Sequence, residues 1–237
     1  MPVRAHDPEL MDLPETDPRR FHRTLRQLSW VNRFLAGARG LLRRTILEDI
    51  RRRPGRPPYT LLDVGSGGCD LALWLARSRG DFRITCLDHD PRAVDYARRL
   101  CAGEAAIEVR LGSAEDLARM ESFDFVFANH FLHHLRDERV APTVAAMLAR
   151  TRRLLVVSDL LRSRLSYVLY SLLAFALLHG SFAIYDGRLS IRRSFRPPEL
   201  QALLAGTAPS GRLEVRAERP GRVVLIGRPA GSLPPAG

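Results

Sequence analysis

The sequence of 237 residues contains no lysine, and all 37 of its Lys or Arg residues are arginine. This absence excludes enzymes that form a Schiff base on lysine, nucleotide-binding loops of the P-loop type, and carriers of lysyl-bound biotin, lipoate or pyridoxal phosphate. Catalytic chemistry therefore has to come from carboxylates, histidines or another bound cofactor.

Cysteines and long apolar runs are also scarce. Cys69, Cys86 and Cys101 are odd in number and lack the paired spacing of zinc sites or secreted disulfide frameworks, which predicts reduced, buried thiols and a cytoplasmic location. The one long uncharged run, Leu165–Leu178, has 14 residues, and roughly 20 are needed to span a bilayer. No basic start followed by an apolar core marks a secretory signal.

The charge is strongly positive. The formal net charge of +11 permits an acidic partner, either nucleic acid or an anionic membrane surface. The arginines are dispersed over several segments, however, as on a solvated surface. A compositional preference for arginine over lysine explains this pattern without any specific partner.

The chain divides into four parts. Residues 1–18 are acidic and proline-punctuated, which predicts a loose tail. Apolar residues at helical spacing predict two helices within 19–58 that end at a basic, proline-rich linker. A compact domain follows over 59–228, and residues 229–237 are predicted to be a flexible tail.

Short apolar runs alternate with helix-sized segments in the compact domain. This alternation predicts right-handed βαβ crossovers and a sheet covered on both faces. Two closely spaced strands joined across Pro220-Gly221 predict an antiparallel C-terminal hairpin. The predicted fold class is therefore α/β, doubly wound and Rossmann-like, with a seven-stranded, mostly parallel sheet and N-terminal covering helices. The predicted strands are 59–64, 83–87, 107–111, 123–128, 154–157, 213–217 and 223–226.

The first strand leads into the glycine-rich turn Asp63-Val64-Gly65-Ser66-Gly67-Gly68. Glycine lets backbone N–H groups approach a ligand closely, and it tolerates positive φ. Asp88 ends the second strand about 20 residues later, where a carboxylate can accept both hydroxyls of a ribose. Asp63 can orient the amino end of a zwitterion but would repel a pyrophosphate. The pattern favours a nucleoside ligand over a dinucleotide.

In this order, the motifs resemble those of the class I S-adenosylmethionine-dependent methyltransferases over about residues 59–228. The resemblance implies S-adenosyl-L-methionine as the cofactor, with segment 112–117 beside its adenine and segment 123–135 as the family's fourth-strand motif. Ser113 and Cys69 depart from the aspartate and glycine that many members have there. The cofactor-binding residues implied are Asp63, Gly65, Ser66, Gly67, Asp88, His89, Ser113, Ala114, Glu115, Asn129 and His130.

Methyl transfer to oxygen or to an acidic carbon requires loss of a proton, and histidine is the natural base. His133 follows the fourth strand and Asp159 the fifth, and the C-terminal ends of these strands face the ligand crevice. Related small-molecule methyltransferases use such a pair, so His133 with Asp159 is the first choice of catalytic pair and His179 the second. Alternatively, His133 caps a helix or packs beside the cofactor. No metal is expected, because adjacent His133 and His134 should diverge.

The apolar run 165–178, within a segment of about 162–196, is predicted to cover the substrate, which implies an apolar acceptor. A buried helix, a dimer contact and a lipid-facing helix are the alternatives. No transmembrane span is expected, and the chain is expected to be a monomer or a homodimer.

Together these features predict an enzyme of secondary metabolism that methylates a small hydrophobic acceptor. The expected reaction is O-methylation of a phenolic or polyketide-type natural product with a histidine general base, and a quinone precursor is the alternative acceptor. A nucleic-acid methyltransferase is disfavoured, because Asn129-His130-Phe131 lacks the Pro-Pro-aromatic segment that grips a flipped base. A membrane-peripheral accessory protein is a third interpretation.

Overall fold

The computed structural model describes residues 1, 3–13, 15–34, 37–206 and 211–231, except for the side chains of 33 and 34. Residues 232–237, which make up most of the predicted flexible tail, lie outside the described residues.

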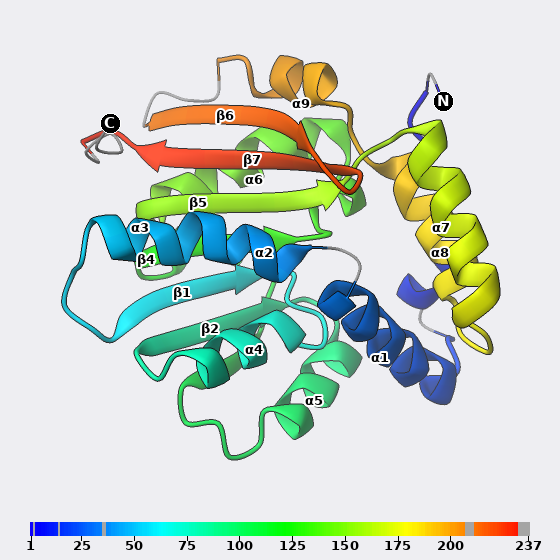
Figure 1. Cartoon of the computed structure of the whole chain (residues 1–237), viewed down its shortest axis with the longest axis horizontal. Helices are drawn as coiled ribbons and strands as arrows, with labels where there is room; N and C mark the ends of the chain where they lie inside the picture. The colour runs from blue at the N-terminus through cyan, green and yellow to red at the C-terminus, as the bar shows by residue number, and fades with distance from the viewer. Residues whose placement is uncertain (2, 14, 35–36, 207–210, 232–237) are drawn as a thin grey trace.

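One seven-stranded sheet organises the fold, in the order β3-β2-β1-β4-β5-β7-β6 (Figure 1). Adjacent strands from β3 to β5 are parallel, and β7 runs antiparallel to both β5 and β6. The predicted fold class and the C-terminal hairpin are thereby confirmed. The strands are β1 Tyr59–Val64, β2 Phe82–Asp88, β3 Ile107–Leu111, β4 Phe123–Asn129, β5 Thr151–Leu160, β6 Gly211–Glu218 and β7 Arg222–Pro229.

Helices cover both faces of this sheet (Figure 1). Side chains alternate along the strands, so Leu61 and Phe125 pack with one set of helices while Leu62 and Val126 pack with α6 and α9 on the other face. The helices are α1 Pro18–Phe34, α2 Ala38–Leu42, α3 Glu48–Arg52, α4 Asp70–Ser78, α5 Pro91–Leu100, α6 Asp137–Ala149, α7 Arg164–Leu177, α8 Ala183–Arg193 and α9 Pro197–Leu204. Short 3₁₀ helices are η1 Leu10–Asp12, η3 Asp116–Arg119 and η4 Leu132–His134, and the π-helix η2 Arg43–Leu47 joins α2 to α3.

The strand order reverses at β1, which lies between β2 and β4. In open α/β sheets, ligands bind at this reversal, outside the carboxyl ends of the strands. The loops that follow β1, β2, β4 and β5 therefore meet at one edge of the sheet.

The N-terminal segment differs from the loose tail predicted for residues 1–18. Arg4 Nη2 donates hydrogen bonds to the carbonyls of His133 and Leu135, at 3.2 and 3.0 Å. The backbone N–H groups of Leu10 and Met11 donate to the carboxylate of Asp186. These partners lie more than 120 residues away in the chain, so local composition did not reveal them.

Asp-Gly is a dipeptide typical of turns, yet Asp186-Gly187 forms no turn here. Both residues lie within α8. A Cβ on Gly187 would lie 2.0 Å from Tyr170 Oη of α7. Glycine therefore allows α7 and α8 to approach closely, which is a packing requirement and not a turn signal.

Candidate active site

The glycine-rich turn after β1 forms an open backbone cradle. Gly65 and Gly67 have φ of +67° and +51°, which glycine adopts without a steric penalty. The N–H groups of Gly65 and Ser66 donate to the carbonyl of Leu87 at 2.8 and 3.2 Å, fixing the turn against β2. Nothing lies within 4 Å of the place where a Cβ on Gly67 would be, so the space beside this residue is open to a ligand.

Asp88 ties this turn to the end of β2. Its Oδ2 accepts a hydrogen bond from Gly67 N at 2.7 Å and its Oδ1 accepts one from Asp90 N at 3.0 Å. Each carboxylate oxygen can accept a further bond, as two ribose hydroxyls would require. The side chain of neighbouring His89 is 75% exposed, with Nδ1 3.6 Å from Asp88 Oδ1.

Carboxylates gather on the other side of the turn. Burial raises the pKa of Asp63, and the charges of Asp70 and Asp88 raise it further. Burial also raises the pKa of Asp70 to about 6, although Asn32 Nδ2 donates to its Oδ1 at 3.3 Å. Asp70 Oδ2 and Asn129 Oδ1 are buried without a hydrogen-bond partner. A cationic ligand with N–H donors would satisfy these atoms, as the amino group of S-adenosylmethionine would.

The loop after β3 is shaped by a carboxylate that the motif comparison missed. Asp116 Oδ2 accepts from Ser113 N at 2.8 Å and from Ser113 Oγ at 3.3 Å. The Ser113 hydroxyl in turn accepts from Glu115 N at 3.2 Å, while the exposed Glu115 carboxylate pairs with Arg139. Half-buried Ala114 packs against the core. Within this loop, the backbone is better placed than the Glu115 side chain to meet a ligand.

Asn129 and His130 end β4. His130 has a φ of +55°, and its N–H donates to the carbonyl of Ser158 at 2.8 Å, which fixes the end of β4 against β5. Burial lowers the pKa of His130 to about 3 against the attraction of Asp159. His130 is therefore neutral at physiological pH.

His133, which follows β4, and Asp159, which lies near the end of β5, form a buried pair. Asp159 Oδ1 lies 2.7 Å from His133 Nδ1, and Asp159 Oδ2 accepts from His133 N at 2.9 Å. The two contacts fix both the ring and the backbone of His133. Since Nδ1 carries a proton toward a carboxylate, Nε2 is the ring atom that faces the remaining space.

Glu9 occupies that side of the ring and was not predicted. Its Oε1 lies 3.5 Å from His133 Nε2 and accepts from Ser190 Oγ at 2.8 Å. Burial alone would lower the pKa of His133, but Asp159 and Glu9 raise it to about 9. Burial likewise opposes ionisation of the two carboxyls, yet His133 holds the pKa of each at about 2. With Glu9 in place, His133 is an imidazolium at neutral pH.

His179 is not part of this arrangement. It is exposed after the end of α7, where its ring contacts Phe175 and its carbonyl accepts from Gln27.

The expected divergence of His133 and His134 is also wrong. Their ring centroids lie 4.2 Å apart, and ligand atoms of Glu9, His133 and His134 all lie within 4.8 Å of one another, as in a metal site. Arg193 Nη1, however, lies 3.6 Å from Glu9 Oε1. Arg193 and protonated His133 already balance the nearby carboxylates, so the cluster requires no metal for neutrality.

All three cysteines are buried free thiols, as predicted. In the described part of the chain, no helix is both long and apolar enough to cross a membrane.

Comparisons with known proteins agree with this geometry. Residues 61–156 match a family model described as a methyltransferase domain. No curated protein matches the chain.

Solved structures share the fold at low identity. The plantazolicin methyltransferase BpumL in complex with SAH is 13% identical, with a TM-score of 0.67 and coverage of 93% of this chain and 94% of that one. The CurJ carbon methyltransferase is 12% identical, with a TM-score of 0.67 and coverage of 92% and 62%. Human N-acetylserotonin methyltransferase in complex with SAM is 17% identical, with a TM-score of 0.61 and coverage of 87% and 55%.

The glycine-rich turn and the carboxylates of Asp63, Asp70 and Asp88 lie within the matched residues 61–156. Residues 61–156 therefore match a methyltransferase domain, and the fold around them is similar to that of methyltransferases solved with SAM or SAH.

Proposed function

We propose that the chain O-methylates a small, largely hydrophobic phenolic or polyketide-type acceptor, with His133 as the general base. The observation that carries this proposal is the buried His133–Asp159 contact of 2.7 Å beside the cofactor turn. A base oriented by a carboxylate suits a hydroxyl acceptor, which has to lose its proton as it is methylated.

Asp63, Asp70, Asp88 and the Gly65–Gly67 turn are the residues proposed to hold the cofactor. When bound, S-adenosylmethionine supplies a methyl group on a sulfonium. The main task of the protein is then to align the acceptor and to remove its proton. His133 Nε2 would take the proton of the acceptor hydroxyl as that oxygen is methylated. Asp159 keeps Nδ1–H in place and stabilises the resulting imidazolium.

Glu9 has to move before this step. It lies where the acceptor hydroxyl would meet Nε2, and its charge adds to that of Asp159 in keeping His133 protonated. An acceptor that displaces Glu9 lowers the pKa of His133 and thereby increases the fraction of His133 that is the neutral base. Acceptor binding and base activation are coupled in this scheme.

The covering elements favour an apolar acceptor. Phe21 and Leu25 of α1 pack with Met11 of η1 in one apolar cluster. Val31 of α1 packs with Ala183 of α8 in another. A hydrophobic acceptor that enters between these elements exchanges apolar contacts for apolar contacts, whereas a nucleic acid would bring phosphates into them. The fold is similar to that of the plantazolicin methyltransferase BpumL and of human N-acetylserotonin methyltransferase.

Transfer of labelled methyl from S-adenosylmethionine to a set of alkylated phenols and hydroquinones tests this function. His133→Gln should bind S-adenosylhomocysteine as the wild type does, yet lose transfer by about 100-fold or more. His179→Gln is the matched control and should retain transfer. Label found on carbon, or transfer that persists in His133→Gln, would contradict the proposed mechanism.

A further inference from the structure

Helix α7 carries an exposed apolar face. Leu165, Val168, Leu169, Leu172 and Phe175 are 52 to 73% exposed. At 100° per residue these positions fall on one side of the helix, within an arc of about 120°. Scattered surface leucines are ordinary, but a continuous stripe of this kind indicates an interaction site.

The opposite side of α7 is fastened to α8. Ala174 is fully buried, Tyr170 Oη donates to the carbonyl of Ala183 at 2.6 Å, and Arg188 Nε donates to Ser171 Oγ at 2.9 Å. Figure 1 shows α7 at one end of the molecule, outside α8. The apolar stripe is therefore held on a supported helix and points away from the protein.

Arginines predominate among the charged residues beside this stripe. Between residues 160 and 198 the sequence contains six arginines and one acid, Asp186. Arg162 and Arg193 are buried beside Glu199 and Glu9, whereas Arg164 and Arg192 are exposed. Asp186 is buried and accepts from two backbone N–H groups. At the start of α7, Arg164 and Arg192 line a surface cavity of about 380 Å³ together with Met1, Tyr167 and Val168. The cavity joins two guanidinium groups to the apolar stripe.

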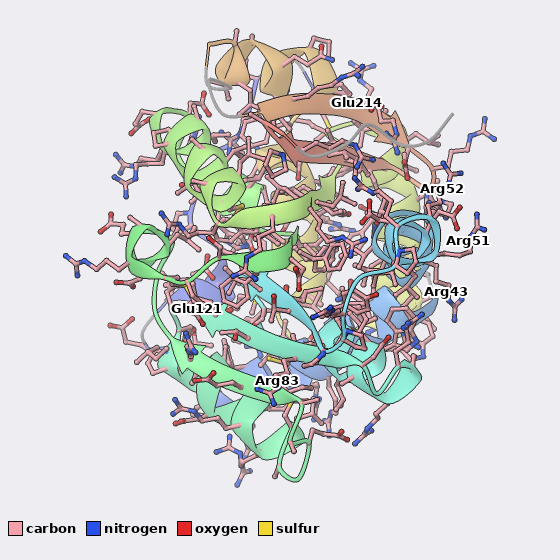
Figure 2. All side chains as sticks on the ribbon, turned by 90° about the vertical axis from the view of Figure 1, so that its left-hand side faces the viewer. Arg43, Arg51, Arg52, Arg83, Glu121 and Glu214 are labelled. Atoms are coloured by element: carbon pink, nitrogen blue, oxygen red, sulfur yellow. The ribbon has the colours of Figure 1, made fainter. Side chains whose placement is uncertain are left out.

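Arginines on the far side of the molecule have a different environment. Figure 2 shows the side away from α7, where residues of both signs such as Arg51, Arg83, Glu121 and Glu214 lie over the surface. Arg51 pairs there with Glu48, and Arg110 with Glu121. A predominance of arginine beside an exposed apolar stripe is thus a local feature of α7 and α8.

We propose that α7 is an interfacial helix that docks the protein on an anionic phospholipid surface. Its apolar stripe enters the acyl-chain boundary, and Arg164 and Arg192 hold lipid phosphates. An amphipathic helix with arginines at its margins binds such a surface in this way. With 14 residues, α7 lies in the interface and does not span it.

The charge pattern favours this occupant over a second copy of the chain. A two-fold contact through α7 would bring the arginine-rich margins of both copies together, with no exposed acid in the segment to balance them. Phosphate headgroups supply the missing negative charge. The proposal is independent of the methyl acceptor, because its readout is binding and not transfer.

Vesicle sedimentation of the full chain tests it, with vesicles of phosphatidylcholine alone and of phosphatidylcholine mixed with phosphatidylglycerol. The wild type should sediment with the anionic vesicles, and more weakly at high salt. Leu172→Ser with Phe175→Ser should weaken this binding by about 10-fold or more. Arg164→Gln with Arg192→Gln should weaken it by roughly 25-fold, since each arginine near an anionic surface contributes about 5-fold.

Matched substitutions on other surfaces should leave vesicle binding unchanged: Leu100→Ser for the apolar pair and Arg83→Gln for the charged pair. Unchanged binding of S-adenosylhomocysteine would show that every variant is folded. The proposal is overturned if the wild type stays in the supernatant with both vesicles, or if the controls lose binding equally. It is also overturned if sedimentation equilibrium without lipid finds a dimer that Leu172→Ser with Phe175→Ser dissociates.

Discussion

Asp159 is the main cause of the raised pKa of His133, and Glu9 adds to it through a single contact at Nε2. Because a carboxylate near the ring favours the imidazolium, replacing it by the isosteric neutral amide in Glu9→Gln should lower the pKa of His133 from about 9 by about 1 unit. The ring resonances of His133, followed by NMR across pH, measure this pKa without any acceptor.

Glu15→Gln removes a charge from the same segment but from an exposed position, and it should leave the His133 titration where it is. An unchanged midpoint in Glu9→Gln would mean that Asp159 alone holds the proton. In that case displacement of Glu9 could not activate the base.

The His133–Asp159 pair should stabilise the fold in a defined pH window. His133 has a folded pKa raised from 6.5 to about 9, so its contribution is complete below pH 6.5 and is lost as pH rises through 9. Asp159 has a pKa lowered from 3.8 to about 2, so its contribution is present above pH 3.8 and is lost as pH falls through 2. The pair therefore acts fully between pH 3.8 and 6.5.

Asp159→Asn should lower the free energy of unfolding by about 3 kcal/mol inside that window, because an ionised partner is left buried. The difference from the wild type should shrink as pH rises past 9, where His133 becomes neutral. Urea unfolding at several pH values measures it, and exposed Asp95→Asn provides a control. A difference that stays constant across pH would argue against charge pairing as its cause.

Among single residues of the candidate site, the sequence predicted those that belong to recognisable motifs at the ends of strands. Asp63 and Asp88 lie at the C-terminal ends of β1 and β2 and His133 follows β4, so topology alone brings them together. Glu9 was not predicted, because it contacts His133 from 124 positions away in the chain. Asp70 was not predicted either, because it lies just beyond the glycine-rich turn 63–68. An acid at the first position of the helix after the glycine turn was the available signal for Asp70.

In the turn after β1, two separate requirements for glycine can be distinguished: a positive φ and the lack of space for a Cβ. Gly65 has positive φ, and a Cβ there would lie 2.5 Å from Phe131 Cδ2, whereas Gly67 has positive φ but open space. Gly80 has open space and no positive φ. The three positions form a matched series for alanine substitution.

Gly67→Ala should cost about 1–2 kcal/mol of stability from the backbone alone. Gly65→Ala should cost more, because Phe131 has to move as well, and it should also weaken S-adenosylhomocysteine binding. Gly80→Ala should be neutral or slightly stabilising. Thermal unfolding and calorimetric titration measure the two effects, and equal losses at Gly65 and Gly67 would exclude the Phe131 contact as a cause.

Strands were easier to predict than the covering helices. β1 and β3 have the predicted bounds, because continuous apolar runs flanked by turn residues mark buried parallel strands. The apolar run 165–178 did not reveal its environment, since a buried helix and a helix with one exposed apolar face have similar composition. The structure excludes full burial of α7. The sequence did not indicate α8 as one helix, because Gly187 within it is typical of a turn, whereas here it allows α8 to pack closely on α7.

Over the whole molecule, the N-terminal segment connects parts that the sheet does not. Arg4 holds the carbonyls after β4, Glu9 reaches His133, and Arg92 of α5 donates to the carbonyls of Met11 and Leu13. Near α8, Ala5 N donates to the carbonyl of Arg192 at 3.1 Å. The segment is thus a strap across the carboxyl edge of the sheet that closes the candidate site without belonging to the matched domain.

Removal of residues 1–13 should open this edge and leave the sheet intact. We expect faster amide hydrogen exchange in segments 131–136 and 183–193, because both lose hydrogen bonds and cover, with little change in β1 and β2, whose ladders the strap does not touch. Hydrogen exchange measured by mass spectrometry follows all four segments in one sample, so β1 and β2 serve as the internal control. Uniformly faster exchange would instead mean that the strap stabilises the entire fold, and unchanged exchange everywhere would mean that it does not cover the site in solution.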